Sequence, residues 1–413
     1  MLLPVVNCAK LVCRLAIGLD KQPELVAHLK SDKADQDDGG PRDTLPERAA
    51  DTLRKAFTTC LNDRAAALSS DGKPIGKKKG IYKIANICLK ILFQCRKTRN
   101  ATMIFENIGL QSPQLSAYPR SERVTYLYYL GRYLFQTNHF YRAQEALQHA
   151  YDLSPTAQQC VRQRRYILVY LVTCNLILGR FPSSALLQRP EAARLQQHFS
   201  PIMQAMRTGN LALFRQHLDF DSPSADWLLH FRILLPLRNR CEVHVWRSLV
   251  SKTWQISGEK AKADHVGNVV LQLKYLVQAF SLAEGLAQSP TDASYIDPEF
   301  DDEDEDDAEA AADSTPITVS STSIESILSS LISQGFVNGF VSHRELRLIM
   351  TLMRHGNVVA TGFPQPWSVI QQKVKGDVEV PGWRKHAQGG GLGGGGGGGR
   401  VVSLSGARAA GAA

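Results

Sequence analysis

Residues 321–343 carry the sequence STSIESILSSLISQGFVNGFVSH. Its apolar residues recur at helical spacing, and they are Ile324, Ile327, Leu328, Leu331 and Ile332. This pattern predicts a helix over 323–333 that buries one stripe of side chains. Ser321, Thr322 and Ser323 are the candidates for its N-cap, because a hydroxyl there accepts a hydrogen bond from a free backbone N–H.

A glycine stop and short extended pieces follow this helix. Gln334-Gly335 ends it, because glycine adopts the left-handed conformation that closes many helices. Residues 336–341 then have the β-branched and aromatic composition of a strand. A second such piece lies at either 346–352 or 358–361. This order predicts a two-stranded β wing after the helix.

Two more helices are expected upstream of this segment. One covers 241–254 and follows the basic turn Leu237-Arg238-Asn239-Arg240. The other covers 266–283. Three helices followed by a two-stranded wing predict a winged-helix module.

Residues 124–157 match the tetratricopeptide (TPR) pattern. The matching residues are Leu130-Gly131 in the first helix, and Ala143, Leu147, Ala150 and Pro155 in and after the second. Small residues at these positions let two helices approach closely. Because about three repeats are needed for a stable solenoid, this unit is expected to belong to a larger helical stack. The alternative is an ordinary pair of antiparallel helices, and either interpretation gives a scaffold.

Most of the chain before 285 has the period of 3.6 residues that is typical of helices. Predicted helices cover 4–30 (the last part as a separate helix), 47–67, 81–96, 100–108, 121–136, 139–152, 158–178, 191–206, 209–218 and 225–235. Short connections predict that neighbouring helices pack antiparallel. The expected fold is therefore all-α, with a TPR-like helical-repeat stack followed by a winged helix with a short two-stranded wing.

The sequence divides into five parts. These are an N-terminal helical region with a basic loop (1–118), the repeats (119–235), the winged helix (236–364), an acidic insert within it (288–320) and a Gly-rich tail (365–413). Residues 292–313 hold 12 acids without a Lys or Arg, and ten of the eleven residues 389–399 are glycine. Such compositions cannot bury a core, so the insert and the tail are predicted to be disordered.

The charge of the folded part is strongly basic. The chain has 48 Lys and Arg against 39 Asp and Glu, a net charge of +9. Since 12 of the 39 acids lie in the insert, only 27 acids balance the 48 basic residues elsewhere. Basic surfaces favour nucleic acid or acidic protein partners.

The sequence argues against a membrane protein and a secreted disulfide scaffold. The longest apolar stretch, 166–179, is shorter than the about 20 residues of a bilayer span. The first 19 residues resemble a signal peptide, but Lys10 and Arg14 interrupt them and no small-residue cleavage site follows. The eight cysteines form no CxxC pair, which favours reduced thiols in the cytosol or nucleus.

Motifs of enzyme chemistry are absent from the sequence. There is no GxxxxGK[ST] phosphate loop, no GxSxG and no HExxH. The acidic run 301–307 lacks the spacing and the turn glycine of a calcium loop. We therefore expect no catalytic activity, no cofactor and no metal.

Four segments together resemble the PCI-domain proteins of the COP9-signalosome-subunit-12-like family, which includes the PCI subunit of the transcription-and-mRNA-export complex. They are SERVTYLYYLGRYLFQTNHFYRAQEALQHAY (121–151), RRYILVYLVTCNLILGRFPSSALL (164–187), GNLALFRQHL (209–218) and LISQGFVNGFVSH (331–343), with a closing Gly362-Phe363-Pro364. The resemblance covers roughly 80–364.

The resemblance implies a non-catalytic adaptor in the nucleus, with the cytoplasm as a second location. Implied partners are a large scaffold subunit or other PCI subunits, a small acidic Sem1/DSS-type protein, and RNA and double-stranded DNA, without a membrane.

This sequence departs from the family in four places. Its first helix resembles an internal family segment, so the family N-terminus is expected to be truncated. The insert 292–313 interrupts the winged helix. About ten extra residues, 345–354, separate the wing strands, and the tail 365–413 has no counterpart.

Candidate nucleic-acid contacts are the clustered cations. They are Lys77, Lys78, Lys79 and Lys83 near the basic loop, Arg238, Arg240, Arg247 and Lys252 around the first winged-helix helix, and His343 and Arg344 at the wing turn. Clustered cations suit phosphates because each neutralised phosphate releases a counterion. The outward positions of 323–333 hold Glu325 and serines, without the donors that read base edges. Binding without strong sequence specificity is therefore expected.

Arg162, Arg164 and Arg165 are candidates for contact with an acidic partner, with RNA, or with solvent alone. The alternative to an adaptor that binds nucleic acid is a structural PCI subunit of a COP9-signalosome- or proteasome-lid-like assembly, with no nucleic-acid role.

Overall fold

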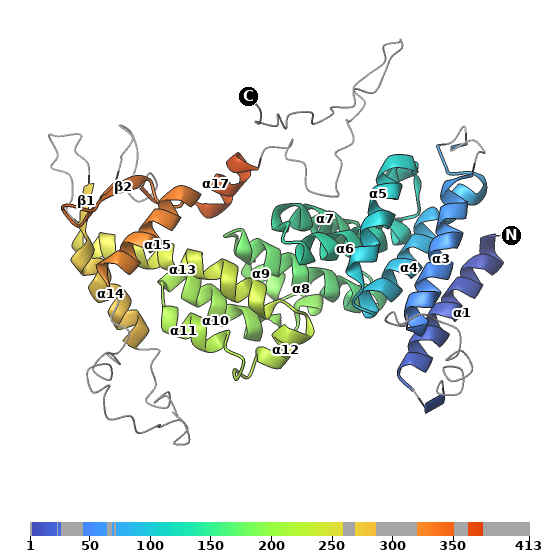
Figure 1. Cartoon of the computed structure of the whole chain (residues 1–413), viewed down its shortest axis with the longest axis horizontal. Coiled ribbons are helices and arrows are strands. Elements are labelled where there is room, and N and C mark those ends of the chain that lie inside the picture. Colours follow the sequence, from blue (N-terminus) through green and yellow to red (C-terminus); the bar gives the residue numbers. More distant parts are fainter. Residues whose placement is uncertain are drawn as a thin grey trace, which may run out of the picture.

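A computed structural model describes residues 2–22, 24–25, 44–63, 68–69, 72–258, 269–285, 320–350 and 362–374. The molecule is elongated, with the N-terminal helices at one end and a small sheet at the other (Figure 1). The predicted all-α fold with a winged-helix module is confirmed.

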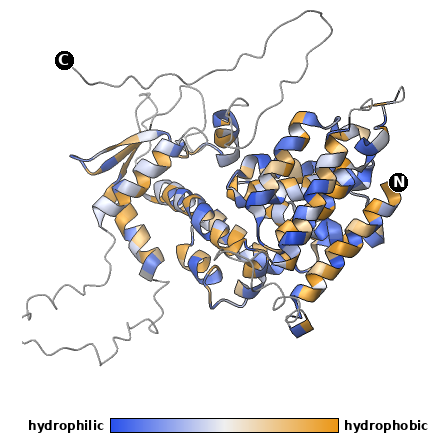
Figure 2. Ribbon diagram, turned by 45° about the vertical axis from the view of Figure 1, so that its right-hand side comes forward, coloured by the Kyte–Doolittle hydropathy of each residue, from blue (hydrophilic) through white to orange (hydrophobic). Residues whose placement is uncertain are grey.

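The N-terminal end is a layer of packed helices. It contains α1 (Leu2–Asp20), α3 (Leu45–Leu61), α4 (Ile81–Gln94) and α5 (Ala101–Gln111). Helix α1 is long and apolar enough to cross a membrane by length and composition alone, a test that the core helix of a soluble protein and a signal sequence also pass. Its Ala9, Cys13 and Ala16 are buried, and it packs against α3 and α4. Figure 2 colours most of the α1 ribbon as hydrophobic, and Leu3, Leu11 and Leu15 of this helix are exposed.

The tetratricopeptide-like hairpin consists of α6 (Arg120–Gln136) and α7 (Phe140–Leu153). A Cβ on Gly131 would lie 2.5 Å from Cγ of Leu147, so glycine is needed where the helices touch. Ala143, Leu147 and Ala150 are fully buried in this contact. The sequence pattern therefore predicted the packing of this pair.

The stack continues through further helices. They are α8 (Val161–Ile177), α9 (Ser184–Leu187), α10 (Leu195–Thr208), α11 (Leu211–His217) and α12 (Ala225–His230). Helix α8 contains most of the long apolar stretch of the sequence, and nearly all its residues from Ile167 to Ile177 are buried. It is thus a core helix, because a helix that is apolar on every side must be covered on every side.

Helix α13 (Leu234–Ser257) joins the stack to the winged helix. It packs against α8, α10 and α11 on one side of the joint, and against α14 (Leu273–Gly285) and α15 (Ser321–Gln334) on the other. The prediction that this helix begins at 241 after a basic turn was wrong. Arg238 and Arg240 lie inside the helix, which begins at Leu234.

The wing has three strands instead of the predicted two. Strands β1 (Val269–Gln272), β2 (Gly339–Ser342) and β3 (Arg347–Met350) form an antiparallel sheet in the order β1-β3-β2. Met350 pairs with both Val269 and Gly339. Strand β3 confirms the first of the two predicted positions, 346–352, so the residues 345–354 are not only an extra link between the strands. Residues 269–272 were predicted to be helical, and that prediction was wrong. The β1–β3 pairing joins segments far apart in the chain, which local periodicity cannot detect.

Both ends of α15 are capped by residues close in the sequence, and the C-terminal cap determines where β2 can begin. Its N-cap is Ser320, whose hydroxyl accepts from the Ser323 N–H at 3.2 Å, and not one of the three predicted residues. At the other end Gly335 has a φ of 79°, and the N–H groups of Gly335 and Phe336 donate to Ile332 and Leu331. This is a Schellman closure, so Phe336 belongs to the helix cap and β2 begins later than predicted.

The Gly-rich tail was predicted to be without structure from 365, but its first part folds as α17 (Pro366–Lys373). In Figure 1, α17 lies between α15 and α7. The acidic block 292–313, the alternative strand 358–361 and the tail after 374 lie outside the described residues.

Candidate nucleic-acid and partner interface

The predicted nucleic-acid contacts fall in different parts of the molecule. Lys77, Lys78 and Lys79 lie on the 3₁₀ helix η1 (Gly76–Gly80), and Lys83 lies on α4. The winged-helix candidates lie on α13, which runs from the repeat stack to the winged helix, and on the β2–β3 turn beside the small sheet (Figure 1). The structure therefore separates the N-terminal cluster of lysines from the winged-helix candidates.

Within the N-terminal cluster, Lys77 and Lys79 are exposed. The η1 turn is held by the Tyr118 hydroxyl, which donates to the Lys78 carbonyl at 2.9 Å, and by the Lys77 N–H, which donates to a side-chain oxygen of Asp63 at 3.0 Å. Lys83 instead lies 3.5 Å from the buried carboxylate of Glu122. Burial raises the pKa of Glu122, and Lys83 opposes this rise. Lys83 is thus committed to a partner within the chain.

The four candidates on α13 do not form one surface. Because successive residues of a helix are rotated by about 100°, Arg238 and Lys252 lie on one side and Arg240 and Arg247 roughly opposite. Arg240 and Lys252 are exposed, whereas Arg238 lies 3.9 Å from Asp219. The sequence grouped these cations by proximity along the chain, and the helix separates them.

Arg247 was predicted to contact phosphate, and the structure places it in an internal contact. Its Nη2 donates to the carbonyls of Phe363 at 2.7 Å and Pro364 at 2.9 Å. Burial lowers the pKa of this guanidinium. The Arg247 side chain binds the backbone of the segment before α17. It is therefore not available to a phosphate while that segment is bound.

The wing turn carries one paired and one exposed cation. Nδ1 of His343 lies 2.8 Å from Oε2 of Glu325 on α15, although most of the ring is exposed. Arg344 is exposed beside it. Ser326, Ser329 and Ser333 line the open side of α15, which therefore lacks charged or amide donors for base edges.

The three arginines at the start of α8 have different surroundings. Arg162 is exposed. Arg165 is half-buried, and its Nη1 donates to the Ala193 carbonyl at 2.7 Å. Arg164 was predicted to contact a partner, but its side chain is only 5% exposed, so that prediction is wrong for this residue.

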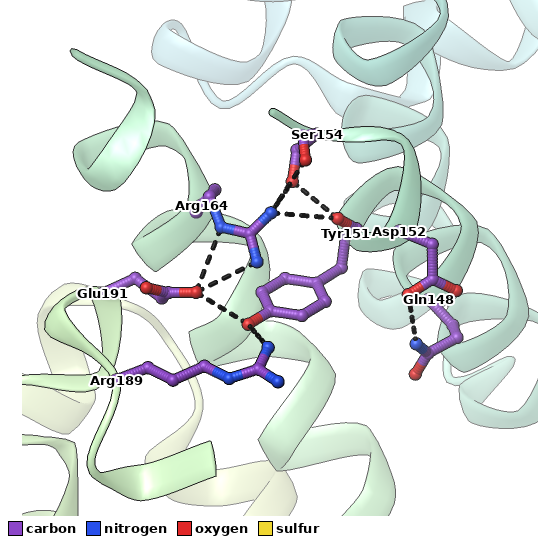
Figure 3. A network of polar contacts seen from close by, with 7 residues as sticks. All are labelled: Gln148, Tyr151, Asp152, Ser154, Arg164, Arg189 and Glu191. Carbon is purple, nitrogen blue, oxygen red and sulfur yellow. Dashed lines mark hydrogen bonds and ion pairs between the residues drawn. The ribbon is translucent and has the colours of Figure 1, made fainter. Parts of the chain in front are cut away.

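Arg164 is the centre of a buried polar network (Figure 3). Its Nε and Nη2 each donate to Oε1 of Glu191 at 3.0 Å, and its Nη1 donates to Ser154. The Tyr151 hydroxyl donates to the same Glu191 oxygen at 2.8 Å and accepts from Arg189 at 2.9 Å. The guanidinium also lies 4.1 Å from the centre of the Tyr151 ring. These contacts fix the end of α7 against α8.

The electrostatics of the network agree with a structural role. Burial alone would raise the pKa of Glu191, but hydrogen bonds from its backbone, Tyr151 and Arg164 outweigh it and hold that pKa below its usual value. The carboxylate is therefore stabilised in its charged form. Sequence reasoning missed this network because Glu191 and Tyr151 are 40 residues apart and belong to no motif.

A shallow depression lies beside the network. It has a volume of 610 Å³ and is lined by Arg120, Arg164 and Arg189, together with Asp152 and the loop 154–157. Arg120 and Arg189 are exposed. Neither was among the predicted site residues, because they lie far apart in the sequence.

The described residues give no group of three or more His, Cys, Asp or Glu that could hold a metal. Burial raises the pKa of the Cys88 thiol to about 12, and it raises the pKa values of Cys174 and Cys241 as well. Thiols held neutral in this way are poor nucleophiles. They pack as small apolar side chains in the core.

No protein-family model matches the chain. A PCI domain-containing protein of Schizosaccharomyces pombe is 28% identical over 342 residues, which are 83% of this chain and 67% of that protein. The protein CSN12 homolog of Neurospora crassa is 30% identical over 258 residues, 61% of this chain and 54% of that protein. The PCI domain-containing protein 2 of Danio rerio is 29% identical over 172 residues, 42% of this chain and 40% of its own length.

The chain spans about two thirds of the fission-yeast relative and about half of the Neurospora relative. These relatives and the architecture agree, because a helical-repeat stack that continues into a winged helix is what the resemblance to PCI-domain proteins predicts. The chain is therefore similar, in sequence and in architecture, to PCI domain-containing proteins and to the CSN12 homologues.

Proposed function

We propose that the chain is a non-catalytic scaffold subunit of a nuclear complex for transcription-coupled mRNA export, where its winged helix contacts RNA and double-stranded DNA. The observation that carries the scaffold part is the continuity of α13. One 24-residue helix packs both in the repeat stack and in the winged helix. A partner bound on either part is thereby held in a fixed relation to the other.

The nucleic-acid part rests on the distribution of charge. Arg240, Lys252 and Arg344 are exposed on the winged helix, and Lys77 and Lys79 at the opposite end of the stack. Each contact between a lysine or arginine and a phosphate contributes through counterion release and is independent of sequence. The serine-rich side of α15 provides no base-reading donors, so binding with little sequence preference fits this surface.

An acidic protein partner is proposed for the repeat stack. The depression is lined by Arg120 and Arg189, and Arg162 is exposed near the start of α8. These cations could bind the carboxylates of an acidic segment, such as one from a small acidic Sem1/DSS-type protein. A large scaffold subunit or other PCI subunits are the remaining proposed partners.

The second candidate function is a structural PCI subunit of a COP9-signalosome- or proteasome-lid-like assembly without a nucleic-acid role. Internal pairing favours it, because Arg247 and His343 have partners within the chain. The two candidates differ in what the exposed cations do.

Fluorescence anisotropy with labelled RNA and duplex DNA distinguishes the two candidates. The test variant is Arg240→Glu/Lys252→Glu/Arg344→Glu in the full chain. Its control is Lys21→Glu/Lys55→Glu/Lys90→Glu, which changes the net charge equally at exposed positions of the N-terminal helices. A third variant, Lys77→Glu/Lys79→Glu, tests the other cluster.

If the winged helix binds, the first variant loses at least tenfold in affinity and has a shallower salt dependence, while the control remains within twofold of wild type. Equal loss in the test variant and the control would mean that net charge alone attracts nucleic acid. If the wild-type chain binds neither RNA nor duplex DNA, with or without the acidic partner, the result would favour the structural subunit.

A further inference from the structure

The segment 362–374 has contacts that its place in the sequence did not predict. It contains Phe363-Pro364-Gln365-Pro366-Trp367, and α17 begins within this run. Proline fixes the backbone angle φ, and Pro366 is the first residue of α17, so this segment loses little conformational entropy when it is bound. Helix α17 lies between the repeat stack and the winged helix in Figure 1.

Trp367 is held by two side chains of the repeat stack. Its ring is stacked on that of Tyr141 from α7, with centroids 5.5 Å apart and planes inclined by 22°. The guanidinium of Arg180, which follows the end of α8, lies 4.5 Å from the centre of the same indole. Stacking and cation–π contacts of this geometry each favour an aromatic side chain beyond its burial alone.

The backbone of the segment is recognised as well. Arg247 donates to the carbonyls of Phe363 and Pro364, and the Gly362 carbonyl accepts from the Asn338 N–H at 2.9 Å. Pro366 lies directly on Gly179, where a Cβ would come within 2.6 Å of the proline Cβ. Gly179 has a φ of +77°, so glycine both closes α8 and leaves room for the ring.

The rest of α17 contacts the winged helix. Nζ of Lys373 donates to the carbonyls of Ser333 at 3.0 Å and Gln334 at 2.7 Å, which are free acceptors at the C-terminal end of α15. Val369 packs beside Gly335, the residue that closes α15. One short segment thus touches α7, the end of α8, α13 and α15.

We infer that Tyr141, Gly179, Arg180 and Arg247 together form a recognition cleft for a short proline–aromatic segment, and that the chain's own residues 363–367 fill it. Filling the site fastens the winged helix to the repeat stack. Because the segment is part of the same chain, its effective concentration at the cleft is on the order of millimolar, so modest intrinsic affinity keeps the site occupied.

The test supplies the segment as a separate molecule. A fluorescein-labelled peptide with the sequence GFPQPWSVIQQKV (362–374) is titrated into full-length chains. The variant Pro366→Gly/Trp367→Ala weakens the binding of the chain's own segment to the cleft and leaves the residues of the cleft unchanged. It is called the weakened variant. We expect this variant to bind the peptide at least tenfold more tightly than wild type, whose cleft is occupied.

Matched arginines show whether the cleft is responsible. Adding Arg180→Ala to the weakened variant should abolish peptide binding. Adding Arg207→Ala should leave it unchanged, because Arg207 makes a comparable contact, 4.7 Å from the Phe181 ring, outside the cleft. Equal binding to wild type and the weakened variant would overturn the inference, and so would the absence of binding to a weakened variant that retains the helical circular dichroism of wild type.

A second measurement uses chains in which the segment 362–374 is unchanged. It tests the inference even if the variant Pro366→Gly/Trp367→Ala does not fold. Hydrogen exchange is compared between single variants Arg180→Ala and Arg207→Ala of the otherwise native chain. Arg180→Ala should speed exchange in 366–374 and at the end of α15 by severalfold, and Arg207→Ala should not. The same protection in both would overturn the inference.

Discussion

The guanidinium of Arg164 lies 3.0 Å from the carboxylate of Glu191, and both side chains are almost completely buried. Tyr151 donates to the same carboxylate oxygen, and Ser154 accepts from the other end of the guanidinium. An ion pair in the interior is stabilising only when its remaining hydrogen-bonding groups are satisfied. Here neighbouring helices provide those partners, so the pair fixes α7, α8 and the turn at 190–192 relative to one another.

Breaking this pair from one side should be costly. Arg164→Ala leaves the Glu191 carboxylate buried without its cation, and we expect it to lower the free energy of unfolding by about 3–5 kcal/mol. Arg162→Ala, two residues away and exposed, should stay within about 0.5 kcal/mol of wild type. Urea denaturation followed by circular dichroism measures both. Similar small losses in the two variants would mean that the pair does not fix the hairpin.

Stability should fall between pH 6.5 and about 4 because of His244. Burial lowers the pKa of this histidine from 6.5 to about 4, while its Nε2 lies 2.8 Å from the Ile177 carbonyl. In that range the unfolded chain binds a proton that the folded chain refuses, so the free energy of unfolding rises with pH, by at most about 1.4 kcal/mol per pH unit from this group.

The measurement compares melting temperatures of wild type and His244→Asn from pH 4 to 7. His244→Asn should flatten the pH dependence. Parallel curves for wild type and His244→Asn would contradict the assignment.

Two glycines in helices should respond to alanine with opposite signs. At Gly131 a Cβ would clash with Leu147, so Gly131→Ala should destabilise the chain by about 1–3 kcal/mol through overpacking. At Gly18 in α1 a Cβ meets no atom within 4 Å, so Gly18→Ala should stabilise by about 0.5–1 kcal/mol through helix propensity. Thermal unfolding of the two variants is the test, and a neutral Gly131→Ala would mean that α6 and α7 do not meet there.

Substitutions of Arg247 and Lys252 should affect different properties, although both residues lie on α13. One should lower stability and the other should weaken nucleic-acid binding. Arg247→Ala removes donors to two carbonyls and should lower the unfolding temperature without changing the salt slope of binding. Lys252→Ala, at an exposed position, should do the reverse and reduce the salt slope by about one. Anisotropy at several salt concentrations, with melting curves of the same preparations, gives both quantities. A changed slope in Arg247→Ala would return this residue to the nucleic-acid surface.

Cysteine labelling should report the packing of the core. Cys8 is exposed on α1, whereas Cys88, Cys174 and Cys241 are buried. A thiol reagent should modify Cys8 within minutes and the three buried residues only as the chain unfolds, because the thiolate is the reactive form. Mass spectrometry of a labelling time course identifies the sites. Fast modification of Cys174 in the native chain would contradict the central position of α8.

Some of the candidate site could be predicted from the sequence and some could not. The clustering of lysines at 77–79 is visible in one loop, and Arg240, Lys252 and Arg344 could be named as candidates from their charge. Arg164 and Arg247 look the same as these cations in the sequence. Their acidic or carbonyl partners lie 27 and more than 100 residues away, so only the folded chain separates them from surface residues.

The sequence by itself determined the helices of the stack, the glycine contact of the TPR-like hairpin and the cap that ends α15. Each of these depends on residues within a few turns of one another, where apolar spacing, a small side chain or a left-handed glycine decides the conformation. Tertiary structure decided which arginines are buried, that 269–272 is a strand, and that the first residues of the tail fold onto the stack as α17. These features are stabilised by contacts between residues that are distant in the chain. Such contacts form only once the helices have packed.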